Sequence, residues 1–444
     1  IAAAYNDAIK TYIVTGVTRS FVGNTANSTW YMLLDANLNM ITVENFELTG
    51  GFTPISASTI VTDVCPVVHE QGYDFAFTGV VLDNSSDADV SGTTPANRTM
   101  FIAKLKASAP TIGDWRNFTF EINSMGVPTI MRRTYPSRII ELPTTSNCAG
   151  GYVVAGTTYR QFSQDPDDAF YFRCDNAMTT YGFKVITDQT FPTPNYGYIS
   201  VGDLYYDAIS NEVHIAGTIQ GDASTGENHY FVDKIINLNS VLPITTYSDT
   251  WLGGFGLGTF RLPFNDLNGF NKVSRIGSPS NNNSVVIGVL YENVPSMAAP
   301  WPQTFKMPLL FQVDYSNAAL ANWTTAQNPQ IDVYPRALAV GMPQTFYPAH
   351  DYNKPWHPSH TGFEFDATNQ MYALGGISVD PVAPTSGEDY LVINMTNAIN
   401  TNTCYHFNQN ASLDVIPLSL QPLTQSDFQG PRFEGSITVS QPQW

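Results

Sequence analysis

The chain has 444 residues, of which 43% are hydrophobic, so it is long and apolar enough to bury a large core. Charged residues make up only 13%, which excludes a disordered chain, and the net charge of −18 disfavours nucleic acid and anionic membrane surfaces as partners. The longest apolar runs, such as SVVIGVL, are too short to cross a bilayer, so we expect no membrane span.

A short apolar run that ends in glycine recurs six times along the chain. The first copy is TYIVTG and the last is YALG, and each is followed by a polar loop and a second apolar run. Self-similarity at a spacing of roughly 60 to 90 residues indicates a repeat architecture. The repeated glycines are Gly16, Gly79, Gly156, Gly217, Gly288 and Gly375.

Each repeat expands into four short strands joined by polar turns. Val, Ile, Tyr, Phe and Thr dominate these runs, as they do in β-strands, and no stretch has the period and caps of a helix. The pieces MITVENFELT, NFTFEIN, GFKVITD, VLPITTY and TCYHFN are interpreted as fourth strands, and the glycine as a position where a Cβ would collide or the strand bends. We therefore predict an all-β fold, a six-bladed β-propeller of four-stranded antiparallel blades with a C-terminal extension. The expected blades are residues 1–50, 57–125, 137–190, 197–247, 271–327 and 358–410.

The third repeat carries a resemblance to known proteins. Its sequence, GGYVVAGTTYRQFSQDPDDAFYFRCDNAMTTYGFKVI, resembles repeats of secreted and cell-surface β-propellers of bacterial type. The resemblance is a pattern over most of residues 1–410 and implies an architecture rather than an activity. The chain lacks a regular WD dipeptide, a kelch signature in every repeat and the Ser-x-Asp-x-Gly-x-x-Trp box of sialidase-like propellers.

The tail, residues 411–444, contains the apolar runs VIPLSL and GSITVS. Two interpretations remain open for it. GSITVS pairs with the first blade and closes the ring, or it adds a strand to a neighbouring molecule. The first blade already has four strand-like runs, IAAAY, TYIVTG, WYMLLD and ITVENF, so ring closure does not require the tail.

Cysteines and glycosylation sequons indicate an extracellular or cell-surface protein. The four cysteines suit two disulfides, with Cys148 paired to Cys174 and Cys65 to Cys404, although four buried free thiols are the alternative. The chain begins at Ile1, which we interpret as a mature protein whose leader was removed. Covalent glycans are expected at the sequons Asn27, Asn84, Asn97, Asn117, Asn282, Asn322, Asn394 and Asn410.

Two kinds of metal site have candidate residues. Closely spaced carboxylates suit calcium, with solvated turns as the alternative, and otherwise no cofactor is expected. Near the sixth blade, His350, His357 and His360 stand beside Asp351 without the spacing of an established zinc signature. The candidate calcium ligands are Asp83, Asp87, Asp89, Asp165, Asp167 and Asp168.

Aromatic residues in two insertions and apolar residues in the tail are the candidate interface. Aromatic side chains anchor buried contacts between proteins, which favours a homo-oligomer or polymer. The candidates are Trp251, Phe255, Phe260, Phe264, Trp356, Ile437, Val439 and Trp444.

No nucleophile elbow, HExxH motif or Ser-His-Asp grouping stands out. We therefore expect a secreted structural or adhesive propeller, a non-enzymatic subunit of an extracellular filament or surface assembly. The alternative function is a carbohydrate-binding or carbohydrate-cleaving propeller that acts through its loop face.

Overall fold

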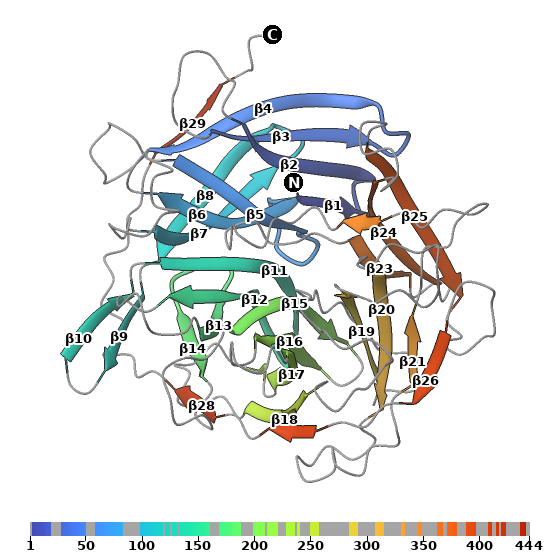
Figure 1. The fold of residues 1–444 in the computed structure, drawn as a ribbon. Helices are drawn as coiled ribbons and strands as arrows, with labels where there is room; N and C mark the ends of the chain where they lie inside the picture. The colour runs from blue at the N-terminus through green and yellow to red at the C-terminus, as the bar shows by residue number, and fades with distance from the viewer. Residues whose placement is uncertain are drawn as a thin grey trace. The chain divides into compact units, whose positions relative to one another are not determined.

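The computed structural model consists of β-strands and turns over the residues that it describes, with no helix among them and therefore none able to cross a membrane (Figure 1). These residues are 2–18, 28–49, 58–82, 98–118, 120–124, 127–131, 133–159, 168–187, 199–208, 211–220, 228–235, 238–239, 249–256, 284–291, 307–314, 330–333, 345–347, 362–366, 371–379, 388–396, 407–410, 414–416, 419–422 and 436–440.

The chain divides into two compact units, and each is described by itself. The first comprises Ile1–Thr187, Ile236–Ser248 and Leu420–Trp444. It contains three antiparallel sheets built from consecutive strands, and a separate hairpin of β9 (Phe120–Ser124) and β10 (Val127–Met131). Sheet 1 contains β1 (Ala2–Asn6), β2 (Thr11–Thr18), β3 (Ser28–Asp35), β4 (Met40–Thr49) and β29 (Ser436–Ser440). Sheet 2 contains β5 (Ser58–Pro66), β6 (Phe75–Leu82), β7 (Arg98–Lys106) and β8 (Thr111–Phe118). Sheet 3 contains β11 (Arg133–Thr145), β12 (Cys148–Tyr159), β13 (Asp168–Cys174), β14 (Tyr181–Thr187) and β28 (Ser419–Pro422).

The second unit comprises Asp188–Ile235 and Asp249–Ser419. It also contains three antiparallel sheets. Sheet 4 contains β15 (Ile199–Asp207), β16 (Glu212–Gln220), β17 (Asn228–Ile235), β18 (Asp249–Gly256) and β27 (Asp414–Ile416). Sheet 5 contains β19 (Ser284–Tyr291), β20 (Met307–Asp314), β21 (Gln330–Val333) and β26 (Phe407–Asn410). Sheet 6 contains β22 (Thr345–Tyr347), β23 (Gly362–Asp366), β24 (Met371–Val379) and β25 (Glu388–Thr396).

The recurring glycine lies on a strand in each of the six sheets: on the second strand of sheets 1 to 4, on the first described strand of sheet 5, and on β24 of sheet 6. It lies in β2, β6, β12, β16, β19 or β24, and in each sheet it pairs with a large apolar residue on the next strand of the chain. The partners, in sheet order, are Trp30, Phe101, Phe170, Phe231, Leu310 and Val392. The predicted strand with the glycine is thereby confirmed in every repeat.

A β-bulge opposite the glycine explains why a side chain is excluded there. In sheets 2, 3 and 4 the preceding strand shifts register directly after the glycine's partner, which is Val61, Pro136 or Val201. A Cβ on Gly79 would lie 2.0 Å from the carbonyl oxygen of Ile60, so the glycine admits a close approach of backbone.

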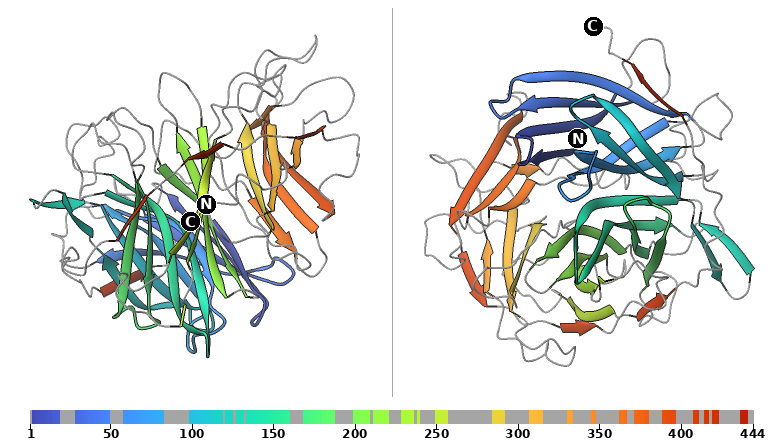
Figure 2. Two further views of the ribbon diagram at one scale, coloured as in Figure 1. Left: turned by 90° about the horizontal axis from the view of Figure 1, so that it is seen from below. Right: turned by 180° about the vertical axis from the view of Figure 1, so that it is seen from behind.

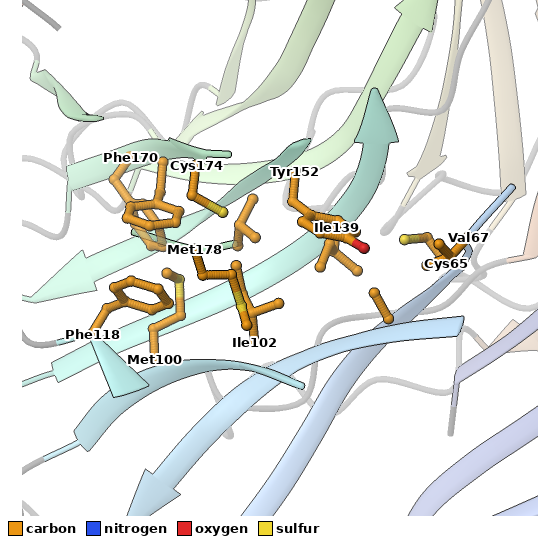
Figure 3. Packing of buried hydrophobic residues seen from close by; sticks show 13 residues of the cluster. Cys65, Val67, Met100, Ile102, Phe118, Ile139, Tyr152, Phe170, Cys174 and Met178 are labelled. Carbon is orange, nitrogen blue, oxygen red and sulfur yellow. The ribbon is translucent and has the colours of Figure 1, made fainter. Parts of the chain in front are cut away.

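Two apolar clusters in the first unit hold neighbouring sheets together. One packs Ile13, Tyr31 and Leu33 of sheet 1 against Phe77 and Phe101 of sheet 2. The other lies between sheets 2 and 3 (Figure 3). It consists of Cys65, Val67, Ala76, Met100, Ile102, Phe118, Ile139, Tyr152, Val154, Phe170, Phe172, Cys174 and Met178.

Several fourth strands differ from the sequence prediction. In sheet 2 the fourth strand is β8, and NFTFEIN is divided between the end of β8 and β9. In sheet 4 it is β18, which was interpreted as part of an insertion, rather than VLPITTY. The end of TCYHFN forms β26 and pairs with β21 in sheet 5 instead of completing sheet 6. In sheet 5 the two paired strands, β21 and β26, lie far apart along the chain, and a local pattern does not encode such a pairing.

Sheet 6 has an interrupted first strand. The strands β22 and β23 both pair with β24, at Ile377–Val379 and at Met371–Gly375, while β25 pairs along the whole of its other edge. The His-containing insertion therefore divides one strand position into two pieces.

Candidate functional site

The C-terminal segment adds strands to sheets that earlier parts of the chain have already built. In chain order β26 pairs with β21, β27 with β18, β28 with β14 and β29 with β4. The segment therefore adds one strand to sheet 5, then one each to sheets 4, 3 and 1. In sheets 1, 3 and 4 the added strand is the fifth, and it lies on the edge formed by the fourth strand. Backbone pairing of this kind is a recurrent way of fastening one chain segment to another.

The last of these strands, β29, has a defined register on β4. Val439 opposes Phe46 and Ile437 opposes Leu48 in an antiparallel pair. Two views show β29, in red, beside the blue strand β4 (Figures 1 and 2). The tail thus pairs with sheet 1 of its own chain, but as a fifth strand, because β1 to β4 already form a complete four-stranded sheet.

The loop that joins β5 to β6, here called the clasp loop (residues 67–74), connects sheet 2 to both of its neighbours. On one side the Asn6 side chain of sheet 1 donates hydrogen bonds to the carbonyl oxygens of Val67 and Asp74, at 2.9 and 2.8 Å. On the other side the Glu141 carboxylate of sheet 3 accepts hydrogen bonds from the backbone N–H groups of Val68, His69 and Glu70. The clasp loop is thereby held by both sheet 1 and sheet 3.

A buried charged cluster lies beneath the clasp loop. The Lys104 ammonium, whose side chain is 1% exposed, lies 2.7 Å from Glu70 Oε1 and 3.4 Å from Asp114 Oδ2. It also donates to the carbonyl oxygen of Asn176, at 2.8 Å, and lies 4.6 Å from the centre of the Tyr73 ring. A lysine is rarely so buried unless it is paired, as it is here.

Tyr152 connects this cluster to the apolar contact between sheets 2 and 3. Its hydroxyl donates to Glu70 Oε2 at 2.6 Å, and Figure 3 shows that hydroxyl pointing towards the end of the cluster where Cys65 and Val67 lie. Burial, and then the hydrogen bond to Glu70, raise the pKa of Tyr152 well above its ordinary value, so it stays a proton donor.

A second ionic contact joins sheets 2 and 3 at their bulges. Asp63, which follows the bulge of β5 and is 3% exposed, accepts a hydrogen bond from the backbone N–H of Ile139 at 2.9 Å. Its other oxygen lies 3.3 Å from the Arg138 guanidinium, directly after the bulge of β11. The repeated bulge therefore places side chains that connect one sheet to the next.

The predicted disulfide between Cys148 and Cys174 is absent. Cys65, Cys148 and Cys174 are free and buried, and Cys404 lies outside the described residues. Cys174 pairs with Tyr152, four residues along β12 from Cys148, a separation on the order of 10 Å that is too long for a disulfide. Burial raises the pKa of all three thiols, so they remain protonated and unreactive.

Three of the candidate glycosylation sites fall in described strands. Asn394 lies in β25 and Asn410 ends β26. Asn117 lies in β8 and is 2% exposed, so the folded chain leaves no room for a glycan there. The others, Asn27, Asn84, Asn97, Asn282 and Asn322, lie outside the described residues.

The metal candidates fall almost entirely outside the described residues. Only Asp168, at the start of β13, is described; Asp83, Asp87, Asp89, Asp165, Asp167 and the histidines 350, 357 and 360 are not. Within the described part of the chain, no group of three or more His, Cys, Asp or Glu side chains is arranged to hold a metal ion.

Four of the eight interface candidates lie in two described strands. Trp251 and Phe255 lie in β18, where Phe255 pairs with Tyr230 on one side and Val415 on the other. Ile437 and Val439 lie in β29. Phe260, Phe264, Trp356 and Trp444 lie outside the described residues.

The clasp loop and the charged cluster were missed at the sequence level. The signals that point to them are an isolated lysine in the apolar run TMFIAKL and a glutamate in the turn before DFAFTG. Comparison with known proteins gives no further assignment, because no protein-family model and no curated protein matches the chain.

Proposed function

We propose that the six sheets are the blades of a β-propeller and that the protein is a structural or adhesive subunit of an extracellular filament or surface assembly. Six glycine-marked repeats and antiparallel sheets built from consecutive strands support the propeller, because stacked four-stranded units bury a continuous core. Its role is to hold other chains, without catalysis.

The observation that carries this proposal is the fifth strand β29 on the edge of β4. Sheet 1 has four strands without β29, so β29 only covers an edge. We expect the four-stranded sheet to stay intact when β29 is removed. The same backbone hydrogen bonds form when the strand comes from a second copy. Such a contact is heterologous, and repetition produces a filament when the rotation between copies does not close a ring.

The composition of β29 suits an exchange between copies. Its sequence, SITVS, has two β-branched apolar residues and no charge, while the whole chain has a net charge of −18. An uncharged strand therefore approaches another copy without adding to the repulsion between them.

The direct experiment traps β29 on its acceptor strand. Phe46→Cys and Val439→Cys oppose each other in the register, so the double variant forms a disulfide when β29 occupies β4. Under assembly conditions we expect disulfide-linked dimers and longer ladders on a non-reducing gel. The out-of-register pair Thr49→Cys and Val439→Cys is the matched control and stays unlinked.

Removal of Ser436–Trp444 tests the consequence. The truncated chain is expected to remain folded and to lose assembly in sedimentation velocity and electron microscopy. If the assembly of the truncated chain equals that of the full chain, or if only intrachain disulfides form under assembly conditions, the proposal of strand exchange is wrong.

The extracellular setting rests on the sequons. Mass spectrometry of the protein secreted from its natural source, before and after removal of N-glycans, tests it. A protein found only inside the cell and without glycans contradicts this part of the proposal.

A further inference from the structure

The charged cluster at Lys104 has the components of a covalent bond between side chains. Lys104 and Asp114 oppose each other on β7 and β8, and the ammonium nitrogen lies 3.4 Å from a carboxylate oxygen. Reacting groups held at about 3 to 3.5 Å react as if at very high concentration. The geometry thus places the Lys104 nitrogen, a nucleophile once it is deprotonated, beside the carboxyl group of Asp114.

A second carboxylate is placed to move protons. Glu70 Oε1 lies 2.7 Å from the same Lys104 nitrogen, within direct reach for proton transfer. Its other oxygen accepts the Tyr152 hydroxyl at 2.6 Å, and this hydrogen bond fixes the orientation of the carboxylate. Glu70 is therefore held in position as a base and an acid for Lys104.

The local backbone is shaped to form this site. The β7–β8 pair shifts register between Lys104 and Leu105, which inserts Gly113 immediately before Asp114. A Cβ on Gly113 would lie 2.9 Å from the Tyr73 ring, so the glycine lets that ring pack closely and cover the lysine. The bulge and the ring together exclude water from the amine.

We propose that Lys104 and Asp114 condense into an intramolecular amide, with Glu70 as the proton shuttle. Glu70 first takes a proton from the ammonium, and the neutral amine attacks Cγ of Asp114. The nitrogen keeps one of its three protons. The other two leave with one oxygen of Asp114 as water, the first delivered by Glu70, which ends unchanged.

The reaction replaces a buried charge pair with a neutral amide. Charges are costly in a medium of low polarity, so the buried ammonium is the group that gains most from neutralisation. The bond fastens β7 to β8 beneath the clasp loop. It depends only on this cluster and is independent of the proposed function.

The test is the intact mass of the full chain, reduced, alkylated and produced where no glycans are added. The expected mass is about 18 Da below that calculated for the alkylated sequence, for one lost water, with a branched peptide that joins Lys104 to Asp114 after digestion. Asp114→Ala is expected to restore the full mass of its own sequence. Because the Asp114 side chain is 35% exposed, this variant is expected to fold.

Two further variants assign the roles. Asp114→Asn is expected to lose about 17 Da, for ammonia in place of water. Glu70→Gln is expected to remain unlinked while its circular dichroism matches that of the parent chain. Lys104→Arg is the charge-preserving control and stays unlinked. A parent chain at its full sequence mass overturns the proposal, and a water loss that persists in Asp114→Ala assigns the bond to Glu70 and overturns the choice of Asp114.

Discussion

The two contacts that sheet 2 makes within the first unit differ in their chemistry. Against sheet 1 it uses an apolar cluster and neutral hydrogen bonds, among them Asn6 to the clasp loop and the Thr29 hydroxyl to the carbonyl of Thr59 at 2.7 Å. Against sheet 3 it adds ions, namely Asp63 with Arg138 and the Glu141 carboxylate on the clasp loop. Equivalent positions in repeated sheets thus carry different polar chemistry, and the cost of breaking each contact reveals which one limits stability.

The stability of the protein should depend more on the ionic contact between sheets 2 and 3 than on an exposed ion pair. Asp63→Ala removes a partner of Arg138 and the acceptor of the Ile139 N–H, and loss of one member of a buried ion pair costs about 3 to 5 kcal/mol. Urea unfolding measures this loss. The matched control is Asp7→Ala, which breaks the exposed pair with Lys10 and should change stability by less than about 1 kcal/mol. Similar losses in both variants would remove the distinction between the two contacts.

The recurring glycine allows a second comparison, between its position in sheet 2 and its position in sheet 1. In Gly79→Ala the new methyl group meets the fixed backbone of Ile60, and such overpacking costs about 3 kcal/mol. In Gly16→Ala it meets the Trp30 side chain at 2.9 Å, which can rotate away, so about 1 kcal/mol is expected. Thermal melting of the two variants provides the measurement. A larger loss of stability in Gly16→Ala than in Gly79→Ala would show that neighbouring side chains, rather than the bulge, make glycine necessary at this position.

Loss of a neutral hydrogen bond between sheets 1 and 2 should cost less stability than loss of the ionic contact between sheets 2 and 3. Asn6 is 1% exposed, and Asn6→Ala leaves the carbonyl oxygens of Val67 and Asp74 without this donor, at a cost of about 2 kcal/mol. Hydrogen exchange at the clasp loop should increase in this variant, with little change in the strands of sheet 3. Uniform faster exchange across all three sheets would instead show that Asn6 supports the whole unit.

The last effect expected is alkaline destabilisation of the sheet 2–sheet 3 contact. Burial raises the pKa of Cys65 and Cys174 above the ordinary 9.0, and that of Tyr152 above 10.0. Above pH 9 the unfolded chain releases protons that the folded chain retains, so stability is full below that pH and decreases above it. Each group contributes a slope of about 1.4 kcal/mol per pH unit. Tyr152→Phe should reduce the slope above pH 10 in urea titrations, and an unchanged slope would contradict the assignment.

The repeated scaffold was largely predictable from sequence, whereas the contacts between sheets were not. Gly16 and Gly375 both lie on predicted strands because the same run of strand-forming residues ending in glycine recurs, and a local run leaves a local pattern. Asp63 and Glu141 are single residues whose partners lie about 70 positions away, so no spacing signals them. Trp251 shows the reverse error: an aromatic, glycine-rich stretch was interpreted as an insertion, yet it pairs along β17 as an ordinary strand.

The position of β29 in the chain has a consequence for synthesis. Its partner β4 ends at Thr49, whereas β29 begins at Ser436, so β4 is synthesised long before β29. During this interval the edge of β4 is available to any other strand, and contacts between such distant positions form slowly. Chains synthesised close together on one messenger RNA therefore bring uncovered edges of β4 near completed copies of β29. If β29 is exchanged as proposed, we expect the order of translation to favour pairing between copies at high rates of expression.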